Sequence, residues 1–201
     1  LYFHPDLIRK SPLGKTIDNY SFFSYDVHEA LHISEDEKKS LNEIVEKIEK
    51  EYNQNIDKHS QKLIISNIEL ILDYCTRYYD RQFYTRTNFN KDVVSKFEQL
   101  LKEYYTSNKP LELGVPTVNY CGTELGMSPN YLSDMLKKET GRNAIDHIHA
   151  YIIDKAKTIL LSSEITVSEI AYNLGFEYPQ YFSKLFKNKT GISPAEYRNI
   201  N

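Results

Sequence analysis

The C-terminal half of the chain contains the same pattern of two helices and a turn twice. The two turn glycines, Gly126 and Gly175, lie 49 residues apart. Five further pairs of identical residues lie 50 apart: Tyr131 and Tyr181, Ser133 and Ser183, Lys137 and Lys187, Thr140 and Thr190, and Gly141 and Gly191. A small residue, Gly122 or Ala171, stands four positions before each turn glycine, where two crossing helices need a small side chain to approach closely. Two such copies in register predict a helical domain that presents two equivalent helices.

The second helix of each copy is predicted to be amphipathic. Apolar residues recur at helical spacing, as Leu132, Met135 and Leu136 and again as Phe182, Leu185 and Phe186. In a DNA-binding helix-turn-helix, this second helix lies in the major groove. The remaining faces therefore predict DNA contacts from Asn130, Ser133, Asp134, Lys137, Pro179, Gln180, Ser183, Lys184 and Lys187. In a single isolated motif the same residues would be ordinary solvated ones, and Tyr131 and Tyr181 are expected to be packing residues.

Residues 115–201 resemble the double helix-turn-helix DNA-binding domain of AraC/XylS-type transcription regulators. The resemblance is strongest in three runs: Ile170-Ala171-Tyr172-Asn173-Leu174-Gly175-Phe176, Tyr181-Phe182-Ser183-Lys184-Leu185-Phe186-Lys187 and Gly191-Ile192-Ser193-Pro194-Ala195-Glu196-Tyr197-Arg198. It implies a sequence-specific regulator that reads two adjacent major-groove segments of promoter DNA, with RNA polymerase as a partner and no cofactor. Asp134 departs from the pattern, because an acidic side chain is unusual on a DNA-reading face. The first copy is therefore expected to bind DNA more weakly than the second.

An all-α fold is expected for the whole chain. Apolar periodicity and capping residues predict helices at 35–52, 60–84, 91–106, 117–125, 129–140, 144–162, 166–174, 179–189 and 194–200. The run from Ser107 to Pro116 is predicted to be a linker or a domain boundary. Residues 1–108 are expected to be the end of a sensor domain plus a helical linker and dimerisation region, and residues 109–201 a seven-helix domain.

The first 30 residues are aromatic and irregular, and they predict either a short strand or an apolar segment that covers a core. The resemblance assigns this stretch to the end of a β-barrel sensor domain, most of which would be missing. The abrupt start at residue 1 suggests a fragment of a longer protein.

A long helix predicted at 144–162 separates the two copies. Its 19 residues span ~28 Å at a rise of ~1.5 Å per residue. Major-groove segments on one face of B-DNA recur every ~34 Å. With the helix ends included, the two reading helices can enter adjacent grooves from one side.

The helix predicted at 60–84 is apolar on more than one face. Such a segment is usually either core or interface. In regulators that resemble this chain, helices before the DNA-binding domain often join two subunits. A homodimer through residues 35–84 is therefore expected, in which two-fold symmetry places Ile64, Ile68 or Ile71 near the same residue of the other subunit. The alternative is a monomer in which three helices bury each other.

Composition limits the other possibilities. The formal net charge is -3, so the binding energy is expected from placed phosphate contacts and a local basic cluster of Lys184, Lys187 and Lys189, not from a broad basic surface. Cys75 and Cys121 are isolated and predict no disulfide framework, which fits the cytoplasm. No apolar run approaches ~18 residues, so no membrane span is expected.

Three further alternatives find less support. A repair methyltransferase fused to such a domain needs a reactive cysteine, often in a zinc-cysteine cluster, and two scattered cysteines do not provide one. A protein-interaction module would use the helices of residues 30–106. His28 and His32 have the i,i+4 spacing of metal ligands but no evident third ligand, so no metal site is predicted. No catalytic residues are predicted, since no nucleophile–base pair, phosphate loop or catalytic metal motif is present.

Overall fold

The computed structural model describes residues 2–199, apart from the side chains of residues 87 and 88, and in this range it contains helices and no strand. The all-α prediction is confirmed. The chain forms two compact units, Leu1–Arg86 and Thr87–Asn201. Among the described residues, no helix is both long and apolar enough to cross a membrane.

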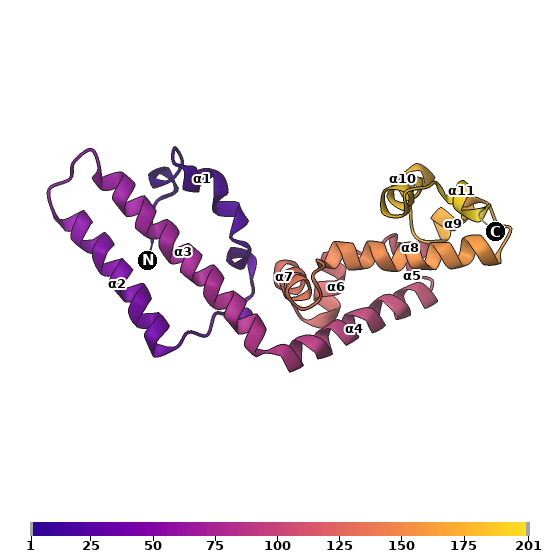
Figure 1. Cartoon of the computed structure of the whole chain (residues 1–201), viewed down its shortest axis with the longest axis horizontal. Coiled ribbons are helices and arrows are strands. Elements are labelled where there is room, and N and C mark those ends of the chain that lie inside the picture. The colour runs from indigo at the N-terminus through magenta and orange to yellow at the C-terminus, as the bar shows by residue number, and fades with distance from the viewer. Residues whose placement is uncertain (1, 200–201) are drawn as a thin grey trace. The chain divides into compact units, whose positions relative to one another are not determined.

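The first unit is a helical hairpin with an irregular N-terminal segment packed on it (Figure 1). Its long helices are α2 (Glu35–Asn53) and α3 (Ser60–Thr85). α2 begins at a capping box of Ser34 and Glu37, in which the Glu37 N–H donates to the Ser34 hydroxyl at 3.2 Å. The N-terminal segment comprises η1 (Pro5–Leu7), α1 (Pro12–Thr16), η2 (Ile17–Asn19), η3 (Ser21–Ser24) and η4 (Val27–Glu29). The short strand considered for this segment is therefore not formed.

The core of the first unit lies between this segment and α3. The buried residues are Ile8, Leu13, Ile48, Ile65, Ile68 and Leu72, with Phe3, Tyr20, Phe22 and other apolar residues packed against them. Phe22 also stacks on Tyr79 of α3, with ring centroids 5.6 Å apart. The segment thus covers the apolar face of α3, as one of the two sequence interpretations predicted.

The second unit contains α4 (Thr87–Thr106) and seven shorter helices. These are α5 (Lys109–Leu113), α6 (Val118–Leu125), α7 (Pro129–Thr140), α8 (Ala144–Ser162), α9 (Val167–Asn173), α10 (Pro179–Thr190) and α11 (Pro194–Arg198). The long helix α8 is central, because it packs against α7, α9, α10 and α11 (Figure 1). It has the 19 residues predicted for it.

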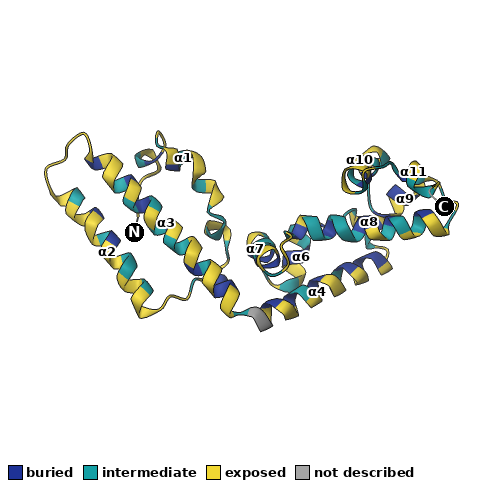
Figure 2. Cartoon of the chain, viewed as in Figure 1, coloured by how far each residue is buried: buried dark blue, intermediate teal, exposed yellow. Residues whose placement is uncertain are grey.

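The boundary between the units differs from the predicted boundary after residue 108. α4 packs against α6 and α7 and buries Val93, Phe97, Leu101 and Tyr104 there. Figure 2 shows buried positions along one side of α4 and exposed positions along the other. Periodicity predicted the helix and its apolar face but not which neighbours that face would meet.

The predicted linker between Ser107 and Pro116 is also structured. Pro110 stands in the first turn of α5, where a proline starts a helix instead of breaking one. The Tyr104 hydroxyl donates to the Gly114 carbonyl at 2.8 Å, and α5 contacts α9. This segment is therefore part of the second unit, not a spacer before it.

The two copies of the motif repeat each other down to single hydrogen bonds. The Thr140 hydroxyl donates to the Leu136 carbonyl at 2.7 Å, and the Thr190 hydroxyl to the Phe186 carbonyl at 2.8 Å. Gly126 and Gly175 both adopt positive φ at the turns, at 67° and 90°. Their surroundings differ, because a Cβ on Gly175 would lie 2.5 Å from the Gly114 carbonyl carbon, while one on Gly126 would meet no atom within 4 Å.

Candidate nucleic-acid interface

α10 presents a polar face to solvent because its opposite face is fully buried. Phe182 and Phe186 have no exposed surface. On a helix, residues that lie two positions from such a stripe point away from it. Gln180 and Lys184 are accordingly exposed, and Lys187 in the last turn is exposed as well, while Pro179 and Ser183 on the flank are half-buried.

α7 presents the equivalent face with less polar surface. Leu132, Met135 and Leu136 are fully buried and anchor the helix. Asn130 and Lys137 are exposed, whereas Ser133 and Asp134 are half-buried. The Ser133 hydroxyl accepts a hydrogen bond from the Ala144 N–H at 3.4 Å. Ser133 therefore helps to join α7 to the start of α8, a structural role that the sequence did not indicate.

The two tyrosines at matching positions of the copies differ in exposure. Tyr131 is 3% exposed and Tyr181 is 62% exposed. The expectation that both are packing residues is correct for Tyr131 and wrong for Tyr181. α7 is packed against two long helices, α4 and α8, whereas α10 is packed against α8 and the short helices α9 and α11. The sequence pattern is the same at both positions, so only the tertiary neighbours distinguish them.

The predicted basic cluster is split by an ion pair within the second unit. Lys189 Nζ lies 2.8 Å from Asp146 Oδ1 and so ties the end of α10 to the start of α8. The hydrogen bond from Lys189 lowers the pKa of the Asp146 carboxyl. Lys184 and Lys187 remain as the exposed cations of α10 that face away from the buried phenylalanines.

Neither cysteine has the environment of a nucleophile. Cys121 is fully buried and Cys75 is half-buried. Burial raises the pKa of the Cys121 thiol to about 11 and also raises the pKa of Cys75. Both thiols are therefore protonated at neutral pH, which removes support from the methyltransferase alternative.

The histidine pair considered as metal ligands does not lie on a helical face. η4 ends at Glu29, so His28 and His32 are not one helical turn apart. His28 lies instead near Asp26 and Glu29. The Glu29 carboxylate accepts a hydrogen bond from the Asp26 N–H at 2.8 Å, which accounts for its position as a cap of that turn.

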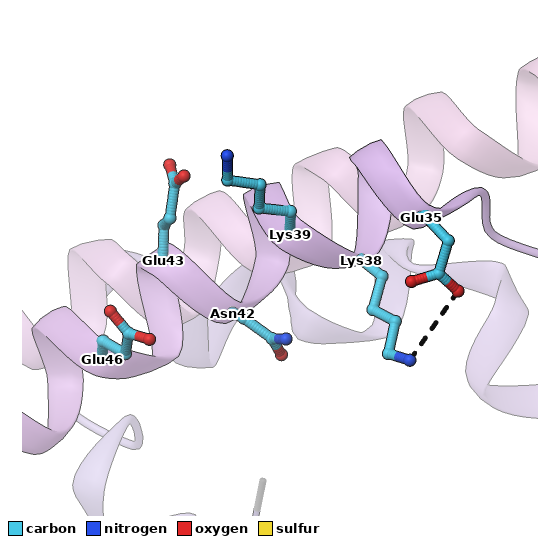
Figure 3. Close-up of a pocket in the computed structure, with 6 residues that line it drawn as sticks. All are labelled: Glu35, Lys38, Lys39, Asn42, Glu43 and Glu46. Carbon is cyan, nitrogen blue, oxygen red and sulfur yellow. Dashed lines mark ion pairs between the residues drawn. The ribbon is translucent and has the colours of Figure 1, made fainter.

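A hollow on α2 has the character of a solvated helix surface. It is lined by residues of this one helix: Glu35, Lys38, Lys39, Asn42, Glu43 and Glu46. Figure 3 shows their side chains extending away from the helix, with one ion pair between Lys38 and Glu35 at 3.8 Å. The opposite side of α2 carries the buried Ile44 and Ile48. These mixed charges are what an amphipathic helix places toward water.

Comparison with known proteins supports the interpretation of the second unit. A family of helix-turn-helix domains matches residues 121–200. The transcriptional regulatory protein YesN of Bacillus subtilis is 33% identical over 111 residues, which are 53% of this chain and 28% of that protein. The xylose operon regulatory protein of Escherichia coli K12 is 34% identical over 77 residues, 38% of this chain and 20% of that protein. The matches thus span less than a third of the length of these relatives.

Among solved structures, the C-terminal domain of the response regulator yesN from Fusobacterium nucleatum is similar at 31% identity. The match covers 54% of this chain and 99% of that one, with a TM-score of 0.47. The matched family, the regulators among the relatives and the duplicated helix-turn-helix of α6–α7 and α9–α10 agree. Residues 121–200 thus form a helix-turn-helix domain of the kind found in AraC/XylS-type transcription regulators.

Proposed function

We propose that this chain binds promoter DNA sequence-specifically by inserting α7 and α10 into two adjacent segments of the major groove. The observation that carries the proposal is the exposed polar row of Gln180, Lys184 and Lys187 on α10, opposite a fully buried face. α8, which packs against both α7 and α10, has a length of ~28 Å that approaches the ~34 Å between successive grooves.

The residue types suggest a division of roles along α10. Gln180 and Lys184 lie one turn apart near the start of the helix, the part of a recognition helix that contacts base edges. A glutamine amide pairs with adenine and a lysine ammonium with guanine. Lys187 lies in the last turn, where a cation serves as a phosphate contact. On α7, Asn130 and Lys137 take the corresponding places, and Ser133 and Asp134 lie at the flank. Pro179 and Ser183 lie at the flank of α10.

Replacing Lys184 by alanine is expected to weaken binding to a selected operator by about 1–3 kcal/mol, the range of one good base contact. The side chain is exposed, so the fold should be unaffected. Fluorescence anisotropy on the operator and on single-base variants measures both affinity and preference. The loss should be concentrated at one base pair, and an unchanged affinity with an unchanged preference would contradict the assignment.

Lys187→Ala provides the matched control, because it removes the same charge from the same helix. It should lower the affinity for all DNA sequences equally. The slope of log affinity against log salt concentration should become shallower by about one, the change expected for the loss of one phosphate contact. A sequence-selective loss for Lys187→Ala would reverse the proposed roles.

We also propose that the protein acts as a homodimer in the cytoplasm and contacts RNA polymerase at the promoter. The predicted interface must be revised, because Ile68 is 2% exposed and belongs to the core of its own unit, together with the partly buried Ile64 and Ile71. Leu63 and Leu70 are 47% and 40% exposed on α3. They lie two helical turns apart and so share one face, which supports a contact between two copies of α3.

Leu70→Lys is expected to convert the dimer to single chains while each unit stays folded, because a charge at the centre of an apolar contact is left without a partner. Sedimentation equilibrium at micromolar concentration measures the mass. Ile68→Glu serves as the contrast, since it should unfold the first unit instead of merely separating subunits. A wild-type mass of one chain at every concentration would exclude the dimer.

The protein-interaction alternative loses support from the position of α4. The apolar side of this helix is buried against α6 and α7, so that side is already occupied within the chain.

A further inference from the structure

The two copies of the motif diverge at the entrance to their second helices. In the first copy Ser128 is the N-cap of α7, and its hydroxyl accepts a hydrogen bond from the Tyr131 N–H at 3.3 Å. The position 50 residues later is Tyr178, the N-cap of α10, which makes no side-chain cap hydrogen bond. The second copy therefore lacks the side-chain cap that stabilises the start of α7 in the first.

Two tyrosine rings occupy this entrance in the second copy. Tyr178 is 47% exposed and Tyr181 is 62% exposed. The rings meet edge to face with centroids 5.7 Å apart at an angle of 89°. This contact orients Tyr181 while leaving most of its ring in solvent. Local stability is thus lower and apolar exposure higher than in the first copy, a combination that occurs where a surface serves binding.

The pair adjoins the residues that the proposed function places against bases. The Tyr178 ring contacts the Tyr181 ring from the N-cap position, and Lys184 is the neighbour of Tyr181 three residues further along α10. Gln180 is the preceding residue on the same first turn of α10. If α10 enters the major groove by its first turns, the ring of Tyr181 enters beside the Gln180 amide.

An exposed aromatic ring in the major groove has one apolar partner of fixed position. The C5-methyl group of thymine is the only methyl that the base pairs present there, and apolar side chains recognise it. A tyrosine ring brings a broad rigid surface to such a contact at a low entropy cost.

We propose that Tyr181, held by Tyr178, packs against the methyl group of a thymine adjacent to the base pair read by Gln180, and so makes the second half-site selective for thymine. The proposal rests on the proposed DNA-binding function. A different contact of the same side chain, from the Tyr181 hydroxyl to a phosphate, is distinguished by the test.

The test uses the full chain and a duplex selected for binding from a random library. Each thymine in the duplex is replaced in turn by deoxyuridine, which removes only the methyl group. At one thymine the wild-type affinity should fall about four-fold, the effect of losing one buried methyl group. Tyr181→Ala should bind the parent duplex more weakly and should not distinguish thymine from uracil at that position, whereas Tyr181→Phe should retain the discrimination.

Tyr172→Ala is the matched control, because Tyr172 is a half-exposed tyrosine of the preceding helix α9. This variant should keep the discrimination at the same thymine. If no thymine position discriminates although the duplex is bound specifically, or if Tyr181→Ala still discriminates, the inference is overturned and the proposed function stands. If Tyr181→Phe weakens binding as much as Tyr181→Ala and uracil has no effect, the contact is to a phosphate and the inference is likewise overturned. Failure to select any duplex would overturn the proposed function itself.

Discussion

Inserting about five base pairs between the two half-sites of the operator should reduce binding to the level of a single helix-turn-helix. Half a turn of DNA places the second half-site on the opposite side of the duplex. α8 packs against α7 and α10 and so links the two copies, and we expect them not to rotate independently. The expected loss is on the order of 2–5 kcal/mol, about half of the free energy that separates specific from non-specific binding.

Gel-shift titration of the two duplexes measures this loss. The control duplex carries the same five base pairs outside the half-sites and should bind as tightly as the parent. On the inserted duplex, Asn130→Ala should have no further effect, because α7 no longer reaches its bases. Equal affinity for the inserted and parent duplexes would mean that only one helix-turn-helix reads the sequence.

Gly175→Ala should destabilise the second unit by about 2–5 kcal/mol. A left-handed conformation costs a non-glycine residue about 1–2 kcal/mol, and Gly175 has φ 90°. The added Cβ would also lie 2.6 Å from the Gly114 oxygen and 2.8 Å from the Val115 nitrogen. These are backbone atoms that cannot rotate away, and overpacking of this kind typically costs a further 1–3 kcal/mol.

Gly126→Ala is the internal control, because Gly126 occupies the same position of the first copy. It has positive φ, but a Cβ added there would have no atom within 4 Å. Only the conformational cost of about 1–2 kcal/mol should appear there. Urea unfolding followed by circular dichroism gives both free energies. Equal values for the two variants would show that the approach of Gly114 to Gly175 relaxes without cost.

The regular helices could be predicted from sequence because their signals are local. A capping serine and apolar residues at helical spacing gave 35–52 for α2, which spans Glu35–Asn53. Apolar residues at helical spacing placed α8 at its observed bounds, Ala144–Ser162. The outward face of α10 followed from the same periodicity, since two buried phenylalanines determine which residues face water.

The remaining features depend on contacts between elements that periodicity does not encode. The run that contains Pro110 is predicted to be a linker, although Pro110 lies in the first turn of α5. Ile68 was assigned to an interface although residues of the N-terminal segment cover it. Tyr131 and Tyr181 share one pattern, and only the different helices around α7 and α10 separate the buried ring from the exposed one.

The approach of Gly114 to Gly175 also limits how such a protein can diverge. The backbone at Gly114 and Val115, which precedes the first helix-turn-helix, packs against the turn at Gly175 in the second. The second copy expressed alone would lack the backbone that packs against its turn, so the two copies are not interchangeable. A longer α8, which more widely spaced half-sites would require, is expected to separate Gly114 from Gly175. The fold therefore constrains the distance between the two DNA half-sites. New DNA sequence preferences are expected to arise by substitutions on the exposed faces of α7 and α10.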